Sequence, residues 1–86
     1  MSEESKDYTY EILKLVESGK ERIFPEDVGL SKEDFLECML DIHDDDMVDN
    51  IGIVKSAGVR SSVYTNNLTL KKEGKKYIEL KEQGKI

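Results

Sequence analysis

Residues 30–46 read LSKEDFLECMLDIHDDD and predict the central helix of the fold. Ser31 stands where an N-cap accepts a hydrogen bond from the first turn, and Asp34 resembles a weaker form of the capping box. Apolar side chains then recur at helical spacing, so we expect this helix to end near Asp45. The apolar arc, about 200° wide, consists of Phe35, Leu36, Cys38, Met39, Leu40, Ile42 and His43. The opposite face carries carboxylates, which are Glu33, Asp34, Glu37, Asp41, Asp44 and Asp45.

The chain at the N-terminal side predicts one further long helix. Apolar residues recur at helical spacing over residues 6–18. Ser5 is the expected N-cap, with Asp7 in the first turn, where the helix dipole favours an anion. Gly19 should end this helix in the left-handed conformation that glycine adopts without strain.

A short extended piece and a single helical turn should lie between these two helices. Residues 22–24 precede Pro25, and a residue before proline is biased away from the helical region of backbone space. Proline suits the first position of a helix, so residues 25–28 should form one turn. Gly29 should stop that turn before the central helix begins.

The chain after the central helix predicts a hairpin and a last helix. Residues 47–55 and 63–70 read as strands, and the small and polar residues 56–62 between them should form a flexible tip. Residues 71–83 should form the last helix. Gly74 lowers the helix propensity of that segment, so we expect it to allow close packing there.

The order helix, short strand, short helix, helix, strand, wing, strand, helix predicts an α+β fold. It is the order of a winged helix-turn-helix with a three-helix core, a small antiparallel β-sheet with a wing, and a C-terminal helix. We expect a single domain over residues 6–83, a disordered N-terminus over 1–5 and a flexible C-terminus over 84–86. The predicted core consists of Tyr8, Ile12, Val16, Phe35, Met39, Ile42, Ile51, Ile53, Leu68, Leu70, Tyr77 and Ile78.

Several short motifs are similar to those of a known family. They are Tyr10-Glu11-Ile12-Leu13, Pro25-Glu26-Asp27-Val28-Gly29, Phe35, Asp44-Asp45-Asp46-Met47-Val48 and Leu70…Gly74…Tyr77-Ile78. Together they resemble the YjcQ-type family of small winged-helix proteins from Gram-positive bacteria and their phages, over roughly residues 6–82. Lys71 replaces a usual threonine cap, and Asp46 replaces a frequent glycine, which Asp can do because it tolerates the left-handed conformation. The resemblance implies the winged-helix fold, and it transfers no functional residue.

Composition argues against several classes of protein. The chain has 86 residues, of which 37% are hydrophobic and 37% charged, and no apolar run approaches the roughly 18 residues of a membrane span. The start of the chain has neither the basic region nor the apolar region of a secretory signal. The lone Cys38 excludes an internal disulfide, and one histidine leaves little material for catalysis. We therefore expect a cytoplasmic, non-enzymatic protein with no cofactor, no metal and no small-molecule substrate.

Charge is divided unevenly along the chain. Residues 1–50 hold 5 Lys/Arg and 16 Asp/Glu, a net charge of −11, whereas residues 51–86 hold 8 Lys/Arg and 3 Asp/Glu, a net charge of +5. The acidic total argues against strong non-specific binding to nucleic acid, which depends on neutralised phosphates. A local basic patch stays open, and the asymmetry otherwise either draws the two halves together within one fold or simply keeps the protein soluble.

A first candidate surface, the partner surface, lies on the central helix. Its members are Glu33, Leu36, Glu37, Leu40, Asp41 and Asp44. The two leucines widen the apolar arc, so they either pack under the wing or form a contact for an unknown protein partner or a second copy, with the acids as its rim. This surface favours an intracellular regulatory or protein-interaction module.

A second candidate surface, the basic set, combines the wing with the last helix. Its members are Lys55, Arg60, Lys71, Lys72, Lys75 and Lys76. They could contact phosphates, whereas the outward face of the central helix lacks the Arg, Asn and Gln side chains that read bases. The alternative function is therefore a DNA-binding transcriptional regulator that contacts the backbone through its wing and last helix.

The remaining reactive side chains have structural interpretations. His43 lies at the edge of the apolar arc and should pack at a boundary, and Cys38 should act as a small buried hydrophobe. The acidic cluster near the end of the central helix consists of Asp41, Asp44, Asp45, Asp46 and Asp49. It does not match a calcium loop, because the position two residues after Asp46 is Val48. We interpret it as a solvated helix end.

Overall fold

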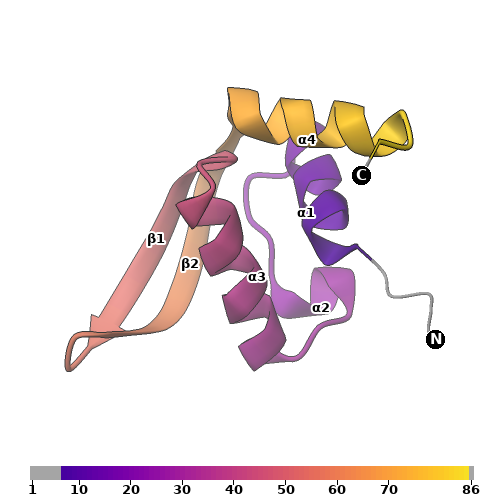
Figure 1. Cartoon of the computed structure of the whole chain (residues 1–86). Coiled ribbons are helices and arrows are strands. Elements are labelled where there is room, and N and C mark those ends of the chain that lie inside the picture. Colours follow the sequence, from indigo (N-terminus) through magenta and orange to yellow (C-terminus); the bar gives the residue numbers. More distant parts are fainter. Residues whose placement is uncertain (1–6, 86) are drawn as a thin grey trace.

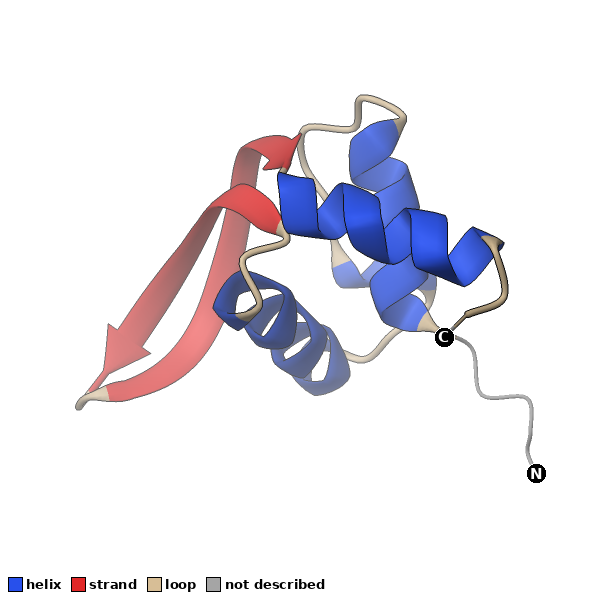
Figure 2. Cartoon of the chain, turned by 45° about the horizontal axis from the view of Figure 1, so that its top comes forward, coloured by secondary structure: helices blue, strands red, loops and turns tan. Residues whose placement is uncertain are grey.

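The computed structural model describes residues 7–85, which form four helices and one antiparallel hairpin (Figure 1). The elements in chain order are α1 (Tyr8–Glu17), α2 (Pro25–Val28), α3 (Lys32–Asp44), β1 (Val48–Ser56), β2 (Val59–Leu70) and α4 (Lys72–Glu82). Helix α4 packs on α1, and the hairpin flanks α3 (Figures 1 and 2). The fold is therefore α+β, as predicted. The expectations for residues 1–5 and for Ile86 lie outside the described residues.

Short polar side chains cap two of the helices. Asp7 accepts a hydrogen bond from the Tyr10 N–H at 3.1 Å and so caps α1. Ser31 caps α3 as predicted, because its hydroxyl oxygen accepts from the Asp34 N–H at 3.2 Å. The prediction for α1 was wrong in register. Helix α1 begins at residue 8, so Asp7 is its N-cap. Ser5, the expected N-cap, lies outside the described residues.

Residues with positive φ end α2 and redirect the chain after α3, as predicted. Gly29 ends α2 with a φ of 73°, and Asp46 follows α3 with a φ of 61°. The Asp46 N–H donates to the His43 carbonyl oxygen at 3.0 Å, and the Met47 N–H donates to the Ile42 carbonyl oxygen at 3.1 Å. These two bonds satisfy carbonyl groups that the end of α3 would otherwise leave unpaired.

The hairpin is longer and its tip is tighter than predicted. Its loop consists of Ala57 and Gly58, with φ values of 53° and 81°. Positive φ at both central residues defines a type I′ turn, whose twist matches that of the flanking strands. Residues 56–62 are therefore not a flexible tip, because Ser56 pairs with Val59 and the ladder continues from there.

A bulge in β2 reverses the direction of a basic side chain. Val54 pairs with Ser62, whereas Lys55 pairs with Arg60. Ser61 is opposite no residue of β1 in the register, and its hydroxyl donates to the Val54 carbonyl oxygen at 3.3 Å. One extra residue in a strand reverses the alternation of side chains beyond it. Arg60 consequently shares the side of the hairpin on which α3 lies.

The segment between α1 and α2 is extended beside β2 without joining the sheet. The Ile23 N–H donates to the Thr65 hydroxyl oxygen at 2.9 Å, and that hydroxyl donates to the Ile23 carbonyl oxygen at 3.2 Å. Further along, the Leu68 N–H donates to the Glu21 carbonyl oxygen at 3.2 Å. The prediction of a short strand over residues 22–24 was therefore wrong, because a side-chain hydroxyl takes the place of the main-chain partner.

One hydrophobic core joins the helices to the hairpin. Its buried apolar residues are Ile12, Leu13, Val16, Ile23, Val28, Phe35, Met39, Ile42, Val48, Ile51, Leu68 and Ile78. Tyr8, Leu70 and Tyr77 of the predicted core are partly buried and pack against it. The prediction for Ile53 was wrong, since this side chain is half-buried and belongs neither to the core nor to the residues packed against it.

Helix α4 comes close to the backbone of Met47 at Gly74. A Cβ at Gly74 would overlap the carbonyl oxygen of Met47 and would come within 2.8 Å of Leu70 Cδ1. The same Met47 carbonyl accepts a hydrogen bond from the Lys71 N–H at 2.9 Å. The close packing predicted for Gly74 is confirmed, and the neighbour is backbone that cannot easily move away.

Gly74→Ala should destabilise the protein, although alanine favours a helix by about 1 kcal/mol over glycine. The overlap with Met47 must push α4 away from the hairpin, so we expect the free energy of unfolding to fall by about 1–3 kcal/mol in urea denaturation. Glu73→Ala, on the exposed side of the same turn, should change it by less than about 0.5 kcal/mol. Unchanged or higher stability of Gly74→Ala would contradict the close packing.

Thr65→Val should also destabilise the protein, because both backbone groups of Ile23 lose their partner. We expect a loss of about 1–3 kcal/mol in the free energy of unfolding. Thr65→Ser keeps the hydroxyl and should recover most of this loss. Thr69→Val, at an exposed threonine of the same strand, serves as the control. Equal stability of the two valine variants would mean that packing alone holds the segment before α2.

Candidate functional site

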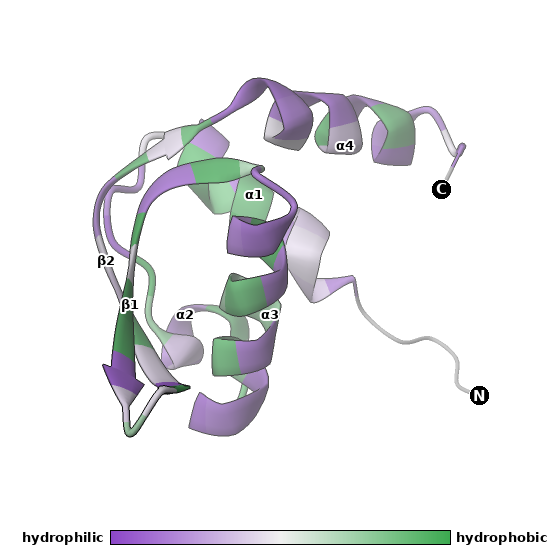
Figure 3. Cartoon of the chain, turned by 60° about the vertical axis from the view of Figure 1, so that its left-hand side comes forward, coloured by the Kyte–Doolittle hydropathy of each residue, from purple (hydrophilic) through white to green (hydrophobic). Residues whose placement is uncertain are grey.

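The outward face of α3 presents carboxylates to solvent. Its exposed acids are Glu33, Asp34, Glu37, Asp41, Asp44 and Asp45. The hydrophobic side of α3 turns toward the hairpin and its hydrophilic side turns away (Figure 3). Within residues 7–85, no ion pair neutralises Glu33, Glu37 or Asp41. This face therefore carries a concentrated negative charge that would repel phosphates and attract cations.

The predicted partner surface forms one stripe along α3. Its six residues follow one another at intervals of one or three, so they lie on one side of the helix. Leu36 and Leu40 are half-buried, yet neither belongs to the buried core or to the residues packed against it. Leu36 instead faces a cleft beside β2. Apolar side chains thus lie directly beside unpaired carboxylates on this helix.

A cleft of about 730 Å³ opens between the start of α3, the segment before α2 and β2. Leu36 lines one wall, Phe24 the second and Tyr64 the third. The two aromatic residues are 50% and 62% exposed. The backbone of Phe24 is held by its N–H, which donates to the Asp27 carboxylate at 2.7 Å. Sequence reasoning missed the cleft, because its walls come from three separate segments. The extended aromatic residue before Pro25 was the one signal that could have indicated it.

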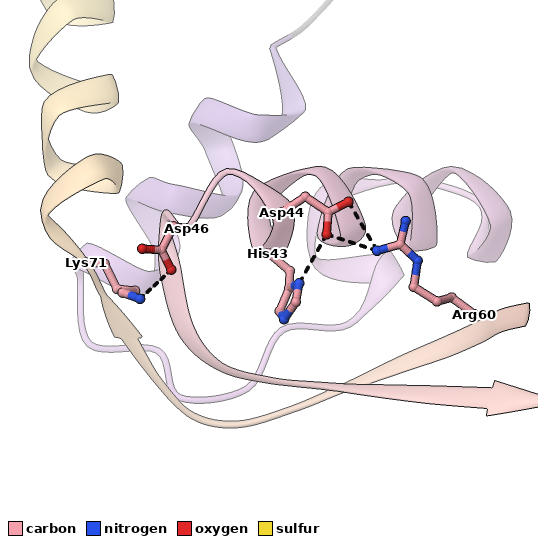
Figure 4. A network of polar contacts seen from close by, with 5 residues as sticks. All are labelled: His43, Asp44, Asp46, Arg60 and Lys71. Carbon is pink, nitrogen blue, oxygen red and sulfur yellow. Dashed lines mark hydrogen bonds and ion pairs between the residues drawn. The ribbon is translucent and has the colours of Figure 1, made fainter. Parts of the chain in front are cut away.

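Arg60 on the hairpin binds the acidic end of α3 (Figure 4). Its Nη1 atom donates to the two carboxylate oxygens of Asp44 at 2.9 and 3.1 Å. The Nδ1 atom of His43 lies 3.3 Å from one of these oxygens. The hydrogen bond from Arg60, and after it the one with His43, lowers the pKa of the Asp44 carboxyl. The structure thus joins a member of the basic set to a member of the partner surface.

A second pair of this kind lies at the base of the hairpin, where Lys71 binds Asp46 (Figure 4). The hydrogen bond with Asp46, supported by the charge of Asp49, raises the pKa of the Lys71 ammonium despite its partial loss of solvent. Two of the six basic-set residues are therefore already engaged by acids of their own chain.

Helices α1 and α4 are also joined by groups from opposite halves of the chain. Lys81 lies 3.0 Å from Asp7, and Lys14 lies 3.0 Å from Glu82. The Tyr77 hydroxyl donates to Asp7 at 2.6 Å, and burial together with this bond raises the pKa of Tyr77 to about 12. Ion pairs therefore join the two halves of the chain within one fold.

The other members of the basic set do not gather on one surface. Lys55, Lys72, Lys75 and Lys76 are exposed, and none forms an ion pair within residues 7–85. Lys55 lies near the tip of the hairpin, whereas the other three lie on α4 at its base (Figure 1). At about 3.3 Å of rise per strand residue, the two ends of the hairpin are roughly 30 Å apart.

The two reactive side chains of α3, His43 and Cys38, lie in different surroundings. His43 is exposed and lies against Asp44, so the prediction that it packs at a boundary was wrong. Cys38 is half-buried, and this burial, followed by the charges of Asp41 and Asp34, raises the pKa of its thiol and disfavours the thiolate. Across residues 7–85, no group of His, Cys, Asp and Glu side chains is arranged to hold a metal ion. None of the helices in this part of the chain has the length and apolar character to cross a membrane.

Comparison with protein-family models, curated proteins and solved structures finds no match to this chain. The interpretation of the site therefore depends on the contacts described above.

Arg60→Gln should raise the pKa of Asp44 toward the ordinary value of about 3.9, because the hydrogen bond that lowers it is removed. An NMR titration of the Asp44 carboxyl carbon measures this change directly. Lys55 is the cross-strand neighbour of Arg60 and does not bind Asp44. Lys55→Gln should therefore leave the pKa of Asp44 unchanged. Identical Asp44 titrations in Arg60→Gln and the parent protein would show that the ion pair does not form in solution.

Proposed function

We propose that this chain is a winged-helix protein of the YjcQ type and that it acts in the cytoplasm as a non-enzymatic interaction module. It presents the outward face of α3 to a basic surface of a protein partner. The order of the elements and the hairpin beside α3 support the winged-helix assignment. In such a fold the third helix is the one that enters the major groove of DNA.

One observation carries the proposal, namely the carboxylate face of α3. A helix that reads DNA needs side chains that donate to bases and approach phosphates, whereas these acids repel phosphates. The same charge attracts a protein surface rich in Lys and Arg and speeds its association. Because Arg60 and Lys71 engage Asp44 and Asp46 at one end of α3, the unpaired acids lie along the rest of the helix.

A second candidate function is DNA binding through the basic set. The observation in its favour is the exposed side of α4, where Lys72, Lys75 and Lys76 have no acidic partner within residues 7–85. Analogy with other winged-helix proteins, which commonly bind DNA, also favours this function. The separation of these lysines from Lys55 along the hairpin weakens this candidate, as does the engagement of Arg60 by Asp44.

Parallel NMR titrations with oligolysine and with a random-sequence DNA duplex should separate the two functions. At about 50 mM salt, oligolysine should shift the amide signals of residues 33–45, and the shifts should shrink at about 200 mM. The duplex should leave the spectrum unchanged. Duplex-induced shifts confined to residues 55–62 and 71–76, lost at the higher salt, would contradict the proposal and favour DNA binding.

Paired charge reversals make the oligolysine test specific for α3. The double variant Glu33→Lys, Glu37→Lys should weaken oligolysine binding at least tenfold. The double variant Glu73→Lys, Glu79→Lys changes the net charge by the same amount at exposed positions of α4, and should weaken it far less. Equal weakening by both pairs would show that oligolysine responds to net charge rather than to this face.

A further inference from the structure

The cleft between the start of α3, the segment before α2 and β2 has the size and lining of a small-molecule site. Its volume of about 730 Å³ lies within the roughly 300–1,000 Å³ of pockets that bind such ligands. Besides Tyr64, six apolar residues line it, namely Ile23, Phe24, Pro25, Phe35, Leu36 and Val63. Ile23 and Phe35 are buried, whereas Phe24 is half exposed. Apolar surface left open to water in this way gains free energy when a ligand covers it.

The wall formed by the segment before α2 is held in place by hydrogen bonds. The Thr65 hydroxyl accepts from the Ile23 N–H at 2.9 Å and donates to the Ile23 carbonyl oxygen at 3.2 Å. The Phe24 N–H donates to the Asp27 carboxylate at 2.7 Å, and the ring of Pro25 fixes the next φ. A wall built in this way has little freedom to lose on binding, so the cleft is largely pre-formed.

The wall formed by β2 supplies backbone hydrogen-bonding groups. Residues 61–66 line the cleft consecutively, and successive side chains of a strand point to opposite faces, so the cleft follows the edge of the strand. The other edge of β2 is bonded to β1. From Val59 to Tyr64, the backbone bonds within residues 7–85 to β1 alone. Residues of this run whose N–H and C=O groups point away from β1 therefore present a donor beside an acceptor to the cleft.

The charged residues of the lining balance one another. They are two cations and two anions, namely Arg22, Lys32, Glu26 and Glu33. The other polar residues of the lining, apart from Tyr64, are Ser61, Ser62, Thr65 and Asn66, which carry no charge. An ion that entered the cleft would lose hydration without a net attraction, whereas a neutral molecule has no such cost. The lining therefore favours an uncharged ligand.

We propose that the cleft binds a neutral, planar small molecule whose edge carries a hydrogen-bond donor next to an acceptor. Its ring lies between Phe24 and Leu36, and its polar edge pairs with the free backbone groups of β2. An extended peptide fits less well, because residues 21–23 cover the edge of β2 at Thr65 and Leu68 and would force the peptide out of the cleft. The inference goes beyond the proposed function, which depends on the outward acids of α3.

An NMR titration of the labelled full chain with isoquinolin-1-one, a neutral bicyclic lactam, tests the proposal. We expect saturable amide shifts of residues 61–64 together with Phe24 and Leu36. The N-methylated lactam lacks the donor and should bind at least fivefold more weakly, because a backbone carbonyl of β2 is then left unpaired. The 1-naphthoate anion, of similar size, should also bind at least fivefold more weakly, because the cleft offers it no net positive charge.

A matched pair of leucine variants locates the site. Leu36→Trp fills part of the cleft and should weaken binding of the lactam at least tenfold. Leu80→Trp makes the same change at another half-buried leucine that lies outside both the core and the cleft, and it should leave the affinity unchanged. Equal affinities of the two variants would overturn the assignment to the cleft. If Leu36→Trp does not fold, the shift map of the parent protein decides the question.

The remaining outcomes are distinct from those of the proposed function. The absence of saturable shifts with the lactam at millimolar concentration would overturn the inference, and the oligolysine titration decides the proposed function independently. Equal binding of the N-methylated lactam would overturn the pairing with β2, and equal binding of 1-naphthoate would overturn the preference for a neutral ligand. Shifts confined to residues 50–52 and 66–67 would place the lactam in a separate hollow of the hairpin and overturn the cleft as its site.

Discussion

The peptide group of Met47 is the junction on which the arrangement of the structure depends. Its N–H donates to the Ile42 carbonyl at the end of α3, and its carbonyl accepts from the Lys71 N–H at the start of α4. Gly74 leaves room for that carbonyl. Met47 therefore connects the end of α3, the start of the hairpin and the start of α4. These contacts set the direction of the hairpin along α3 and leave the acidic face of α3 turned outward (Figure 3).

Stability and surface character come from different interactions in this protein. Burying one large apolar side chain contributes about 1.5–3 kcal/mol, and the core contains twelve buried apolar residues. Exposed ion pairs such as Arg60–Asp44 contribute little to stability, because solvent screens both charges. Their effect is on the surface, since each pair removes a cation and an anion from the groups that a partner can meet. What remains is an acidic stripe on α3 and a basic side on α4.

The differences between prediction and structure concern how segments meet. Ala57 and Gly58 allow a type I′ turn, and this extends both strands into the segment expected to be flexible. The bulge at Ser61 then turns Arg60 toward α3, which a simple alternation would not predict. Thr65 replaces the ladder bonds expected for residues 22–24. Each of these features depends on the register between two segments. The composition and periodicity of a single segment do not determine that register.

Local interactions explain why the helix boundaries and the faces of α3 could be predicted from the sequence. The cap at Ser31, the stop at Gly29 and the left-handed Asp46 each act within a few residues, so their patterns are visible in the amino-acid order. The apolar and acidic faces of α3 follow from helical geometry in the same way. Which cations those acids bind, and where an apolar cleft stays open beside a free strand edge, depended on three-dimensional packing. Long-range ion pairs and clefts form between groups distant in the chain, and their partners are chosen by packing and strand register rather than by sequence distance.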